Sequence, residues 1–587
     1  MLDSPCVTTS TEIAPTKSRK ELAARIGWLV LVCATLYVCY FSHLGAIGFV
    51  GPDEPRYAWI ARDMAESGDW ITPRLYGKPW FEKPPLYYWG AAISFKLFGV
   101  SEAAARLPSA ISALLATLAM AWLAWRVYDA ETARWLLLLL PTTVGMIGFS
   151  HAAATDMPFS AMLTIAMVCA AVIVGLVPQR SNQDGAQHAA PLRDERDAAP
   201  QRRWLAPILF GFFLGLAVLA KGPAGVILCG GTVFFWAFFA KRWREALRLL
   251  HPAAIAPFCL TALPWYILVA RRNPDFFRIF IIEHNFRRYL TPEFQHIQPF
   301  WFYVPIVLVA FLPWTPLLLW SIGIGVTRAV RSRNISRSTG YFLAWALFCI
   351  VFFSISQSKL PGYILPSIPA IGTLLVHSCV AIAPTAARSF RLTLLTGALV
   401  FSTIFAFAEW SALHLSRWNE GFGIAAGLLA AALAIADFTL GIAFPLGHKH
   451  RFYRLAAACC VAPVLVTLSL ADRVLPAFFI FDPSGRSISR ELQLRKIPSK
   501  ELSVYAMGRG LHYSLNFYLR EEIRDWDRAH PQEGYVLLGS HNCRSLAEPP
   551  HTCEQVPFDS GYNTGRFLYR ISTGNSPVNP PSSGKPQ

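Results

Sequence analysis

Charged side chains of both signs are concentrated in two long segments that are rich in aromatic residues, residues 47–90 and 271–301. In the first segment an acid and a base stand side by side before a Pro-Pro pair, which constrains the chain. Neighbouring acids and bases of this kind can hold a phosphate and a sugar together. The candidate residues in this segment are Asp53, Arg56, Tyr57, Glu82 and Lys83.

The second segment and one isolated acid add further candidates. His284 and the pair Arg287 and Arg288 lie in the second segment, and Asp156 lies in a stretch with no other charge. An acid placed at a membrane boundary is costly when it is buried without a partner, which favours a functional role. A role in starting the next helix is the alternative, because Asp at an N-cap satisfies free backbone N–H groups.

The elements that must position these residues are membrane-spanning helices. The chain has 587 residues, of which 54% are hydrophobic, and its apolar residues fall in runs long enough to cross the hydrocarbon core as helices. We therefore predict a polytopic α-helical membrane protein. About thirteen spans are expected, centred near residues 36, 116, 142, 167, 212, 231, 261, 313, 348, 372, 401, 432 and 462.

The distribution of Lys and Arg predicts the orientation of these spans. One set of alternate loops is basic and is expected in the cytoplasm, whereas the loops between them carry few basic residues. This assignment puts the N-terminus in the cytoplasm of a bacterial inner membrane and the C-terminus in the periplasm. It also puts 47–90 and 271–301 on the periplasmic side. Membrane lipids and orientation explain much of the net charge of +17, so we exclude a nucleic-acid partner.

The predicted domains follow from composition. We expect a cytoplasmic tail at 1–24, a transmembrane domain at 25–475 with a flexible cytoplasmic loop at 178–203, a periplasmic α/β domain at 485–572 and a disordered tail at 573–587. Cys543 and Cys553 lie ten residues apart in the α/β domain. An oxidising compartment would favour a disulfide between them, and two free thiols are the alternative.

Ordered motifs between residues 26 and 370 resemble those of the bacterial lipid A aminoarabinose transferases, within the GT-C glycosyltransferases that include the protein O-mannosyltransferases. The motifs are "DEPRYAWIARDM", "FEKPPLYYW", "ATDMPF", "LAKGPAG", "EHNFRRYLTPEFQHIQPFWFY" and "SISQSKLPGYILP". The resemblance implies a GT-C-type fold. It also implies transfer of 4-amino-4-deoxy-L-arabinose from undecaprenyl phosphate to lipid A, with inversion, and resistance to cationic antimicrobial peptides.

The resemblance also implies roles for individual residues. Asp53, Asp156 and Lys83 match the catalytic positions. The positions that bind the donor or its phosphate are matched by Arg56, Tyr57, Glu82, Lys221, His284, Arg287, Arg288 and Tyr363. Cations aimed at the phosphate that leaves are effective catalysts. A lipid A phosphate is already ionised, so Asp53 is expected to orient the reactants or bind the donor's amino group at least as much as to remove a proton.

Several alternatives stay open. Glu82 and His284 are of types that ligate divalent ions, so a metal is open, although the spacing shows no closed metal site and none is required. A related GT-C transferase could move a hexuronic acid or mannose to lipopolysaccharide core or protein. A lipid or sugar transporter would also use charges within a helix bundle. The charges here lie at one interface and no inverted repeat is evident, which favours the transferase.

Overall fold

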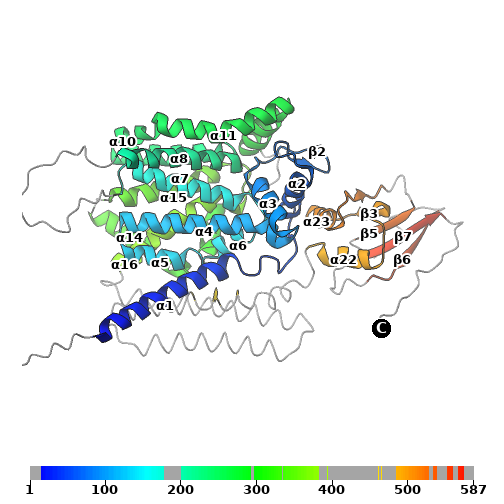
Figure 1. The fold of residues 1–587 in the computed structure, drawn as a ribbon, viewed down its shortest axis with the longest axis horizontal. Coiled ribbons are helices and arrows are strands. Elements are labelled where there is room, and N and C mark those ends of the chain that lie inside the picture. The colour runs from blue at the N-terminus through cyan, green and yellow to red at the C-terminus, as the bar shows by residue number, and fades with distance from the viewer. Residues whose placement is uncertain are drawn as a thin grey trace, which may run out of the picture.

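A bundle of helices carries a smaller α/β domain at one end (Figure 1). The structure is a computed structural model. It describes residues 15–177, 200–291, 297–332, 335–382, 484–527, 533–538, 551–558 and 566–573, with isolated positions at 393, 461, 464, 465 and 468. The predicted loop at 178–203, except for its last four residues, lies outside the described residues, and so do the predicted span centres at 401, 432 and 462.

Long apolar helices form the bundle. Those near the N-terminus are α1 (Pro15–Tyr40), α4 (Glu102–Val127), α5 (Ala130–Leu139), α6 (Val144–Ser150) and α7 (Asp156–Ile173). They are followed by α8 (Pro200–Lys221), α9 (Ala224–Ala240), the short α10 (Trp243–Leu247) and η1 (Arg248–Leu250), and α11 (Pro252–Arg272). The last described ones are α13 (Tyr303–Ala310), α14 (Thr315–Ser332), α15 (Arg337–Ile355), η5 (Pro361–Ser367) and α16 (Ile368–Ile382).

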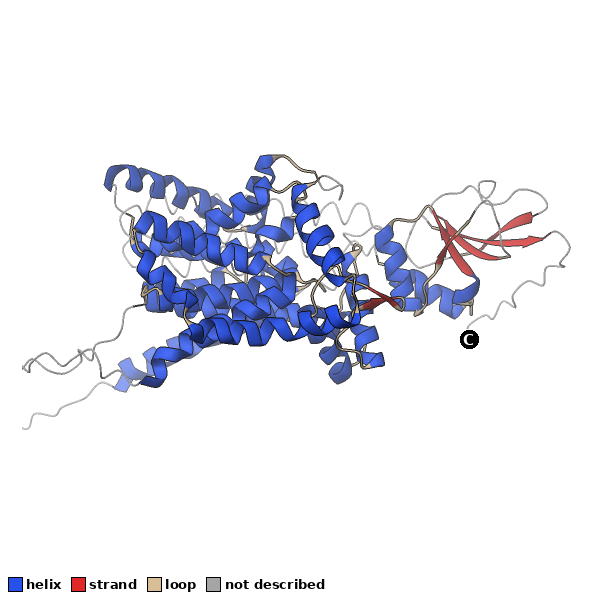
Figure 2. Ribbon diagram, turned by 90° about the horizontal axis from the view of Figure 1, so that it is seen from above, coloured by secondary structure: helices blue, strands red, loops and turns tan. Residues whose placement is uncertain are grey.

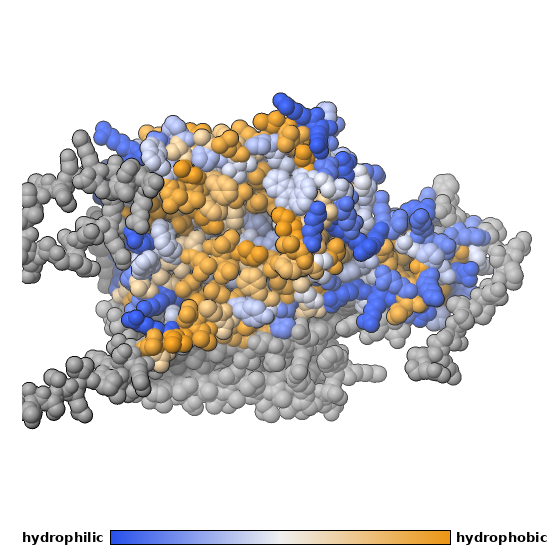
Figure 3. Space-filling view, in the orientation of Figure 1, coloured by the Kyte–Doolittle hydropathy of each residue, from blue (hydrophilic) through white to orange (hydrophobic). Residues whose placement is uncertain are grey.

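Six of the described helices are long and apolar enough to cross a membrane, and the count reaches eight if two bent pairs each form one span. One pair joins α5 to α6 with a bend of 60°, and the other joins α13 to α14 with a bend of 119°. Eight of the first ten predicted centres lie within these helices or within the shorter apolar helices α1 and α9, and those at 142 and 313 lie at the breaks of the two bent pairs. Orange side chains cover most of the flank of the bundle in Figure 3, as lipid contact requires. The chain is thus a multi-pass membrane protein, and the full count of thirteen stays a prediction.

The segment that follows α1 forms a helix, a short β-hairpin and a second helix. These elements are α2 (Asp53–Ser67), the short strands β1 (Arg74–Leu75) and β2 (Lys78–Pro79), and α3 (Leu86–Phe98). Helix α2 has two carboxylates in its first turn, where they favour the positive end of the helix dipole, and it stops at Gly68, whose φ of +76° suits glycine. Its apolar face packs on α3 and α4 in a core shared with Tyr87, Tyr88 and Ala105.

A π-helix and short turns build the second charged segment. They are η2 (Arg278–Arg287), α12 (Arg288–Leu290) and η4 (Phe300–Phe302). Phe276 and Phe280 stack at 5.4 Å and join a buried aromatic cluster with Trp265 and Phe81. This cluster fastens the second segment to the first, so the two candidate regions of the sequence meet at one end of the bundle.

The C-terminal residues form a five-stranded mixed sheet with two helices, α22 (Arg486–Leu494) and α23 (Arg509–Leu519). The strands are β3 (Leu502–Tyr505), β4 (Arg524–Asp525), β5 (Gly534–Leu538), β6 (His551–Val556) and β7 (Phe567–Thr573), in the order β4-β3-β5-β7-β6. The β3 strand pairs parallel to β4 and β5, whereas β7 pairs antiparallel to β5 and β6. Figure 2 shows both helices between the sheet and the bundle.

Candidate active site

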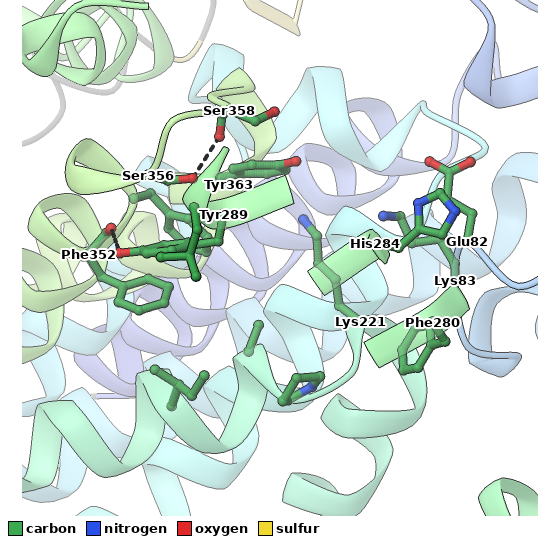
Figure 4. A pocket seen from close by; sticks show the side chains of 15 residues that line it. Glu82, Lys83, Lys221, Phe280, His284, Tyr289, Phe352, Ser356, Ser358 and Tyr363 are labelled. Carbon is green, nitrogen blue, oxygen red and sulfur yellow. Dashed lines mark hydrogen bonds between the residues drawn. The ribbon is translucent and has the colours of Figure 1, made fainter. Parts of the chain in front are cut away.

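A cavity of about 340 Å³ opens at the end of the bundle where the two charged segments meet. It is lined by Glu82, Lys83, Lys221, Pro223, Ala224, Ile227, Phe280, His284, Tyr289, Leu290, Phe352, Phe353, Ser356, Ser358 and Tyr363. Figure 4 shows the charged side chains Glu82, Lys83 and His284 at one end of this cavity, and Tyr289 and Phe352 at the other. The cavity therefore combines an apolar wall with a few cations, which suits an amphiphile with an anionic head.

Lys221 is the cavity cation with the most defined surroundings. It is the last residue of α8, and its Nζ donates a hydrogen bond to Oδ1 of Asp156 at 2.5 Å. The ammonium group also lies 4.6 Å from the centre of the Tyr363 ring, a favourable cation–π distance. A carboxylate and an aromatic face thus hold the lysine in place at the cavity wall.

Asp156 does not cap its helix. Thr155 occupies the N-cap position of α7, and Asp156 lies in the first turn with its side chain 22% exposed. A Cβ atom at Gly362 would come within 2.8 Å of the Asp156 carboxylate, so this glycine leaves room for the acid beside η5. The alternative of an N-cap role is therefore wrong, and the partner of the lone acid comes from a helix 65 residues away.

Asp53 and Glu82 are joined through Arg56. The Arg56 guanidinium forms ion pairs with Asp53 and, at 3.1 Å, with Glu82. Burial alone would lower the pKa of Arg56, but the nearby Tyr57, Glu82 and Asp53 raise it overall, so the side chain keeps its charge. Asp53 is not among the residues that line the cavity, and its side chain is 48% exposed.

Aromatic rings surround Arg56. Its guanidinium carbon lies 5.3 Å from the ring centres of both Tyr57 and Trp80. Tyr57 is buried beside Tyr88, and burial, reinforced by Glu82 and Asp53, raises the pKa of both phenols well above the usual value. Tyr57 therefore stays a neutral packing group near the acids, and it is not among the residues that line the cavity.

A second ion pair beside the site is structural. Glu54 follows Asp53 directly in sequence, but its two oxygens accept hydrogen bonds from Arg106 of α4 at 2.9 and 2.8 Å and from the backbone N–H groups of Val50 and Ala153. Arg106 also donates to three backbone carbonyls, of Leu44, Ile47 and Gly48. Sequence inspection left this pair unassigned, because nothing in the spacing of 52 residues indicates that the two side chains meet.

The second charged segment brings His284 to the cavity. His284 lines the wall, whereas Arg287 is exposed and is not among the lining residues. Arg288 begins α12, and its side chain lies outside the described parts of the chain. Tyr289 was missed by sequence reasoning, although it belongs to a quoted motif: its ring stacks on Phe352 at 4.9 Å and its hydroxyl donates to the Phe352 carbonyl at 2.8 Å.

Part of the motif "SISQSKLPGYILP" has a structural role. Lys359 is buried and its Nζ donates to the carbonyls of Gln298 and Ser356 at 2.9 and 2.6 Å. Burial lowers the pKa of Lys359. These bonds hold the chain of the second segment against the loop before η5, which carries Ser356 and Ser358 to the cavity wall.

The structure bears on the metal candidates Glu82 and His284 and on one cysteine of the predicted disulfide. Within the described ranges, no three or more His, Cys, Asp or Glu residues group closely enough to hold a metal ion. Glu82 and His284 do line the same cavity. Cys553 lies on β6 and is disulfide-bonded, but Cys543 lies outside the described residues, so their pairing stays a prediction.

Known proteins are similar to this chain over most of its length. Residues 26–280 match the family model described as dolichyl-phosphate-mannose-protein mannosyltransferase. The undecaprenyl phosphate-alpha-4-amino-4-deoxy-L-arabinose arabinosyl transferase of Erwinia tasmaniensis is 30% identical over 548 residues, which cover 88% of this chain and 93% of that relative. This chain belongs to that arabinosyl transferase family. A member from Aeromonas salmonicida is 31% identical over 438 residues, covering 73% of this chain and 75% of its own.

A solved structure agrees with this family assignment. The crystal structure of ArnT from Cupriavidus metallidurans bound to undecaprenyl phosphate superimposes with a TM-score of 0.69 at 24% identity, over 93% of this chain and 98% of that one. The arabinosyl transferase family thus shares its helical GT-C fold with this chain. The resemblance seen in the motifs is confirmed, and the protein is a glycosyltransferase.

Proposed function

We propose that this protein transfers 4-amino-4-deoxy-L-arabinose from undecaprenyl phosphate to a phosphate of lipid A. The observation that carries the proposal is the cavity in which Lys83 and Lys221 face a largely apolar wall. An isoprenoid phosphate has this same division into an anionic head and a hydrocarbon tail. The family relatives named for this reaction support the choice of sugar and carrier.

The reaction needs one bond to break and one to form. An oxygen of the acceptor phosphate attacks the anomeric carbon of the sugar from the face opposite the donor phosphate, so the configuration inverts. The bond between that carbon and the donor phosphate oxygen breaks, and its electron pair leaves on undecaprenyl phosphate. Positive charges placed before the reaction stabilise this departing anion at little reorganisation cost.

In the proposed mechanism each residue near the cavity has its own role. Lys83 and Lys221 neutralise the departing phosphate, and Asp156 with Tyr363 keeps Lys221 aimed at it. Asp53 orients the reactants or binds the amino group of the sugar. Arg56 is now assigned to positioning, because its ion pairs hold Asp53 and Glu82 while the residue itself is 5% exposed.

The proposed setting is the periplasmic face of a bacterial inner membrane. The basic residues that the sequence places in the cytoplasm include Arg244 and Arg248, which are exposed at the end of the bundle near α10. The cavity lies toward the opposite end, beside α2 and α3 (Figure 1). If the basic loops lie in the cytoplasm, the donor head group, the acceptor and the C-terminal domain all lie on the periplasmic side.

Mass spectrometry of lipid A tests the proposal directly. A strain that lacks its own transferase but makes the donor is complemented with the wild-type chain, with Lys83→Ala, with Asp53→Asn and with the control Glu66→Gln, whose side chain is 59% exposed near the C-terminal end of α2. We expect a mass gain of one aminopentose residue with wild type and the control, and none with the other two. Unmodified lipid A despite normal expression of the wild type would refute the assignment and would favour another sugar or acceptor.

A further inference from the structure

The C-terminal domain is joined to the first charged segment by specific contacts. Arg486 donates to the carbonyls of Gly45 and Ala46 at 3.1 and 2.9 Å and pairs with Glu102 at 3.4 Å. The hydroxyl of Tyr518 donates to Glu102 at 2.7 Å and accepts from the backbone N–H of Phe49 at 3.1 Å. Directional bonds of this kind define one docking geometry, in which α23 lies against α2 (Figure 1).

Close packing reinforces this geometry. The ring of Phe517 meets Phe49 edge to face at 4.8 Å and lies 5.9 Å from the Arg62 guanidinium. A Cβ atom at Gly510 would come within 3.0 Å of the Gly51 backbone, so α23 approaches the start of the segment as closely as glycine permits. A larger residue at position 510 would therefore press on the backbone of Gly51, and a shift of the helix away from this backbone would break the hydrogen bonds of Tyr518.

One residue of α23 reaches the charged centre of the site. The ring of Tyr513 lies 5.8 Å from the Arg56 guanidinium, the residue that bridges Asp53 and Glu82. The other two rings around this guanidinium, Tyr57 and Trp80, come from the first charged segment. The C-terminal domain thus provides one of three aromatic walls around a cation that holds two acids of the site.

A second residue of α23 holds the hairpin before Glu82 and Lys83. Asn516 donates to the hydroxyl of Tyr76 at 2.9 Å and is itself fixed by accepting from the Ile523 N–H at 3.0 Å. Tyr76 has a φ of +53° in the turn between β1 and β2, a left-handed conformation that is strained for tyrosine. The bond from Asn516 and an edge contact with Trp59 at 4.8 Å help to hold this conformation.

We propose that α23 completes the active site, with Tyr513 and Asn516 as positioning residues. Tyr513 holds Arg56 in the orientation that bridges Asp53 and Glu82, and Asn516 holds the turn whose continuation carries Glu82 and Lys83 to the cavity. This inference rests on the proposed function of the cavity. It makes the C-terminal domain a part of the transferase centre that acts through Arg56 and the hairpin.

Replacement of Tyr513 in the full-length chain tests the proposal. Tyr513→Leu is expected to lower turnover about tenfold and to raise the KM for the donor by no more than about threefold, because a cation–π contact is lost at a positioning group. Tyr513→Phe keeps the ring and should restore turnover to within twofold of wild type. Tyr505→Leu is the matched control, because Tyr505 lies on β3 of the same domain and packs against the sheet; its activity should stay within twofold. Equal losses in Tyr513→Leu and Tyr505→Leu, or full activity of Tyr513→Leu, would overturn the proposal.

Binding of undecaprenyl phosphate to the purified protein separates this inference from the proposed reaction. We expect Tyr513→Leu to raise the Kd about threefold in the wild-type background and by less than 1.5-fold in an Arg56→Ala background, because the ring acts through Arg56. The same increase in both backgrounds overturns the positioning role. A wild-type protein that binds the lipid phosphate with this coupling but transfers no sugar refutes the proposed reaction alone, and one that binds nothing refutes both.

Discussion

Asp53 and Glu54 are neighbours in sequence and of the same chemical type, yet the fold gives them different environments. Glu54 is buried, its two oxygens shared by Arg106 and two backbone N–H groups. Asp53 is half exposed and pairs with Arg56, which also holds Glu82 of the cavity wall. A fully satisfied buried acid serves the scaffold, whereas a partly exposed acid beside a cavity is available to a ligand.

The largest effect is expected from Glu54→Gln, which tests the scaffold half of this comparison. The change leaves the buried Arg106 charge without its partner, and such changes cost about 3–5 kcal/mol. We expect a clear drop in the midpoint of thermal unfolding in detergent and in the amount of folded protein. The control is Asp275→Asn in a pair with Arg278 whose two side chains are 71% and 59% exposed, where the effect should stay below about 1 kcal/mol. Equal midpoints for both variants would contradict a scaffold role for Glu54.

The next effect belongs to the cavity. Asp156→Asn removes the charge that holds Lys221, and we expect turnover to fall roughly 10²- to 10³-fold, the usual result of losing a group that stabilises developing charge. The unfolding midpoint should fall by less than in Glu54→Gln, because the side chains of Lys221 and Asp156 are 9% and 22% exposed whereas those of Arg106 and Glu54 are 3% and 11% exposed. Steady-state kinetics and thermal unfolding of the same preparation measure both. A variant that unfolds at a much lower temperature but keeps its turnover would show that Asp156, like Glu54, stabilises the fold and has no part in the reaction.

A smaller effect is expected from Arg56→Lys. This change keeps the positive charge but removes the guanidinium group that pairs with Asp53 and Glu82 at the same time. An ammonium group is a compact point charge and cannot reproduce the contacts to Asp53 and Glu82 together. We expect turnover to fall about tenfold, with the donor KM nearly unchanged. Wild-type turnover in this variant would show that charge alone suffices at this position.

The smallest effect is expected from chelation. Within the part of the chain that the structure describes, Glu82 and His284 have no third ligand-type residue close enough to form a metal group. We expect EDTA treatment followed by desalting to leave transfer activity within twofold. Loss of activity that is restored by one divalent ion would instead establish the metal alternative at these two residues.

Sequence reasoning was most effective where the physical signal is local. Runs of apolar residues predicted the six helices that are long enough to cross a membrane and both bent pairs, since a residue in contact with lipid is apolar whatever its neighbours are. It also named Glu82, Lys83, Lys221, His284 and Tyr363, which the fold brings to one cavity. It placed Tyr57 and Arg287 in the same class, although Tyr57 is buried in the α2–α3 core and Arg287 is exposed and does not line the cavity.

The sequence by itself determined which segments lie in lipid and which lie in water. It also determined which types of side chain lie at one end of the bundle. Both follow from composition and spacing along a single helix or loop. Tertiary structure alone decided which charge meets which: Lys221 reaches Asp156, Arg106 reaches Glu54, and Tyr513 lies against Arg56. The physical reason is that an ion pair or ring contact depends on a few ångströms between side chains, and such distances between remote segments are set by the packing of whole helices.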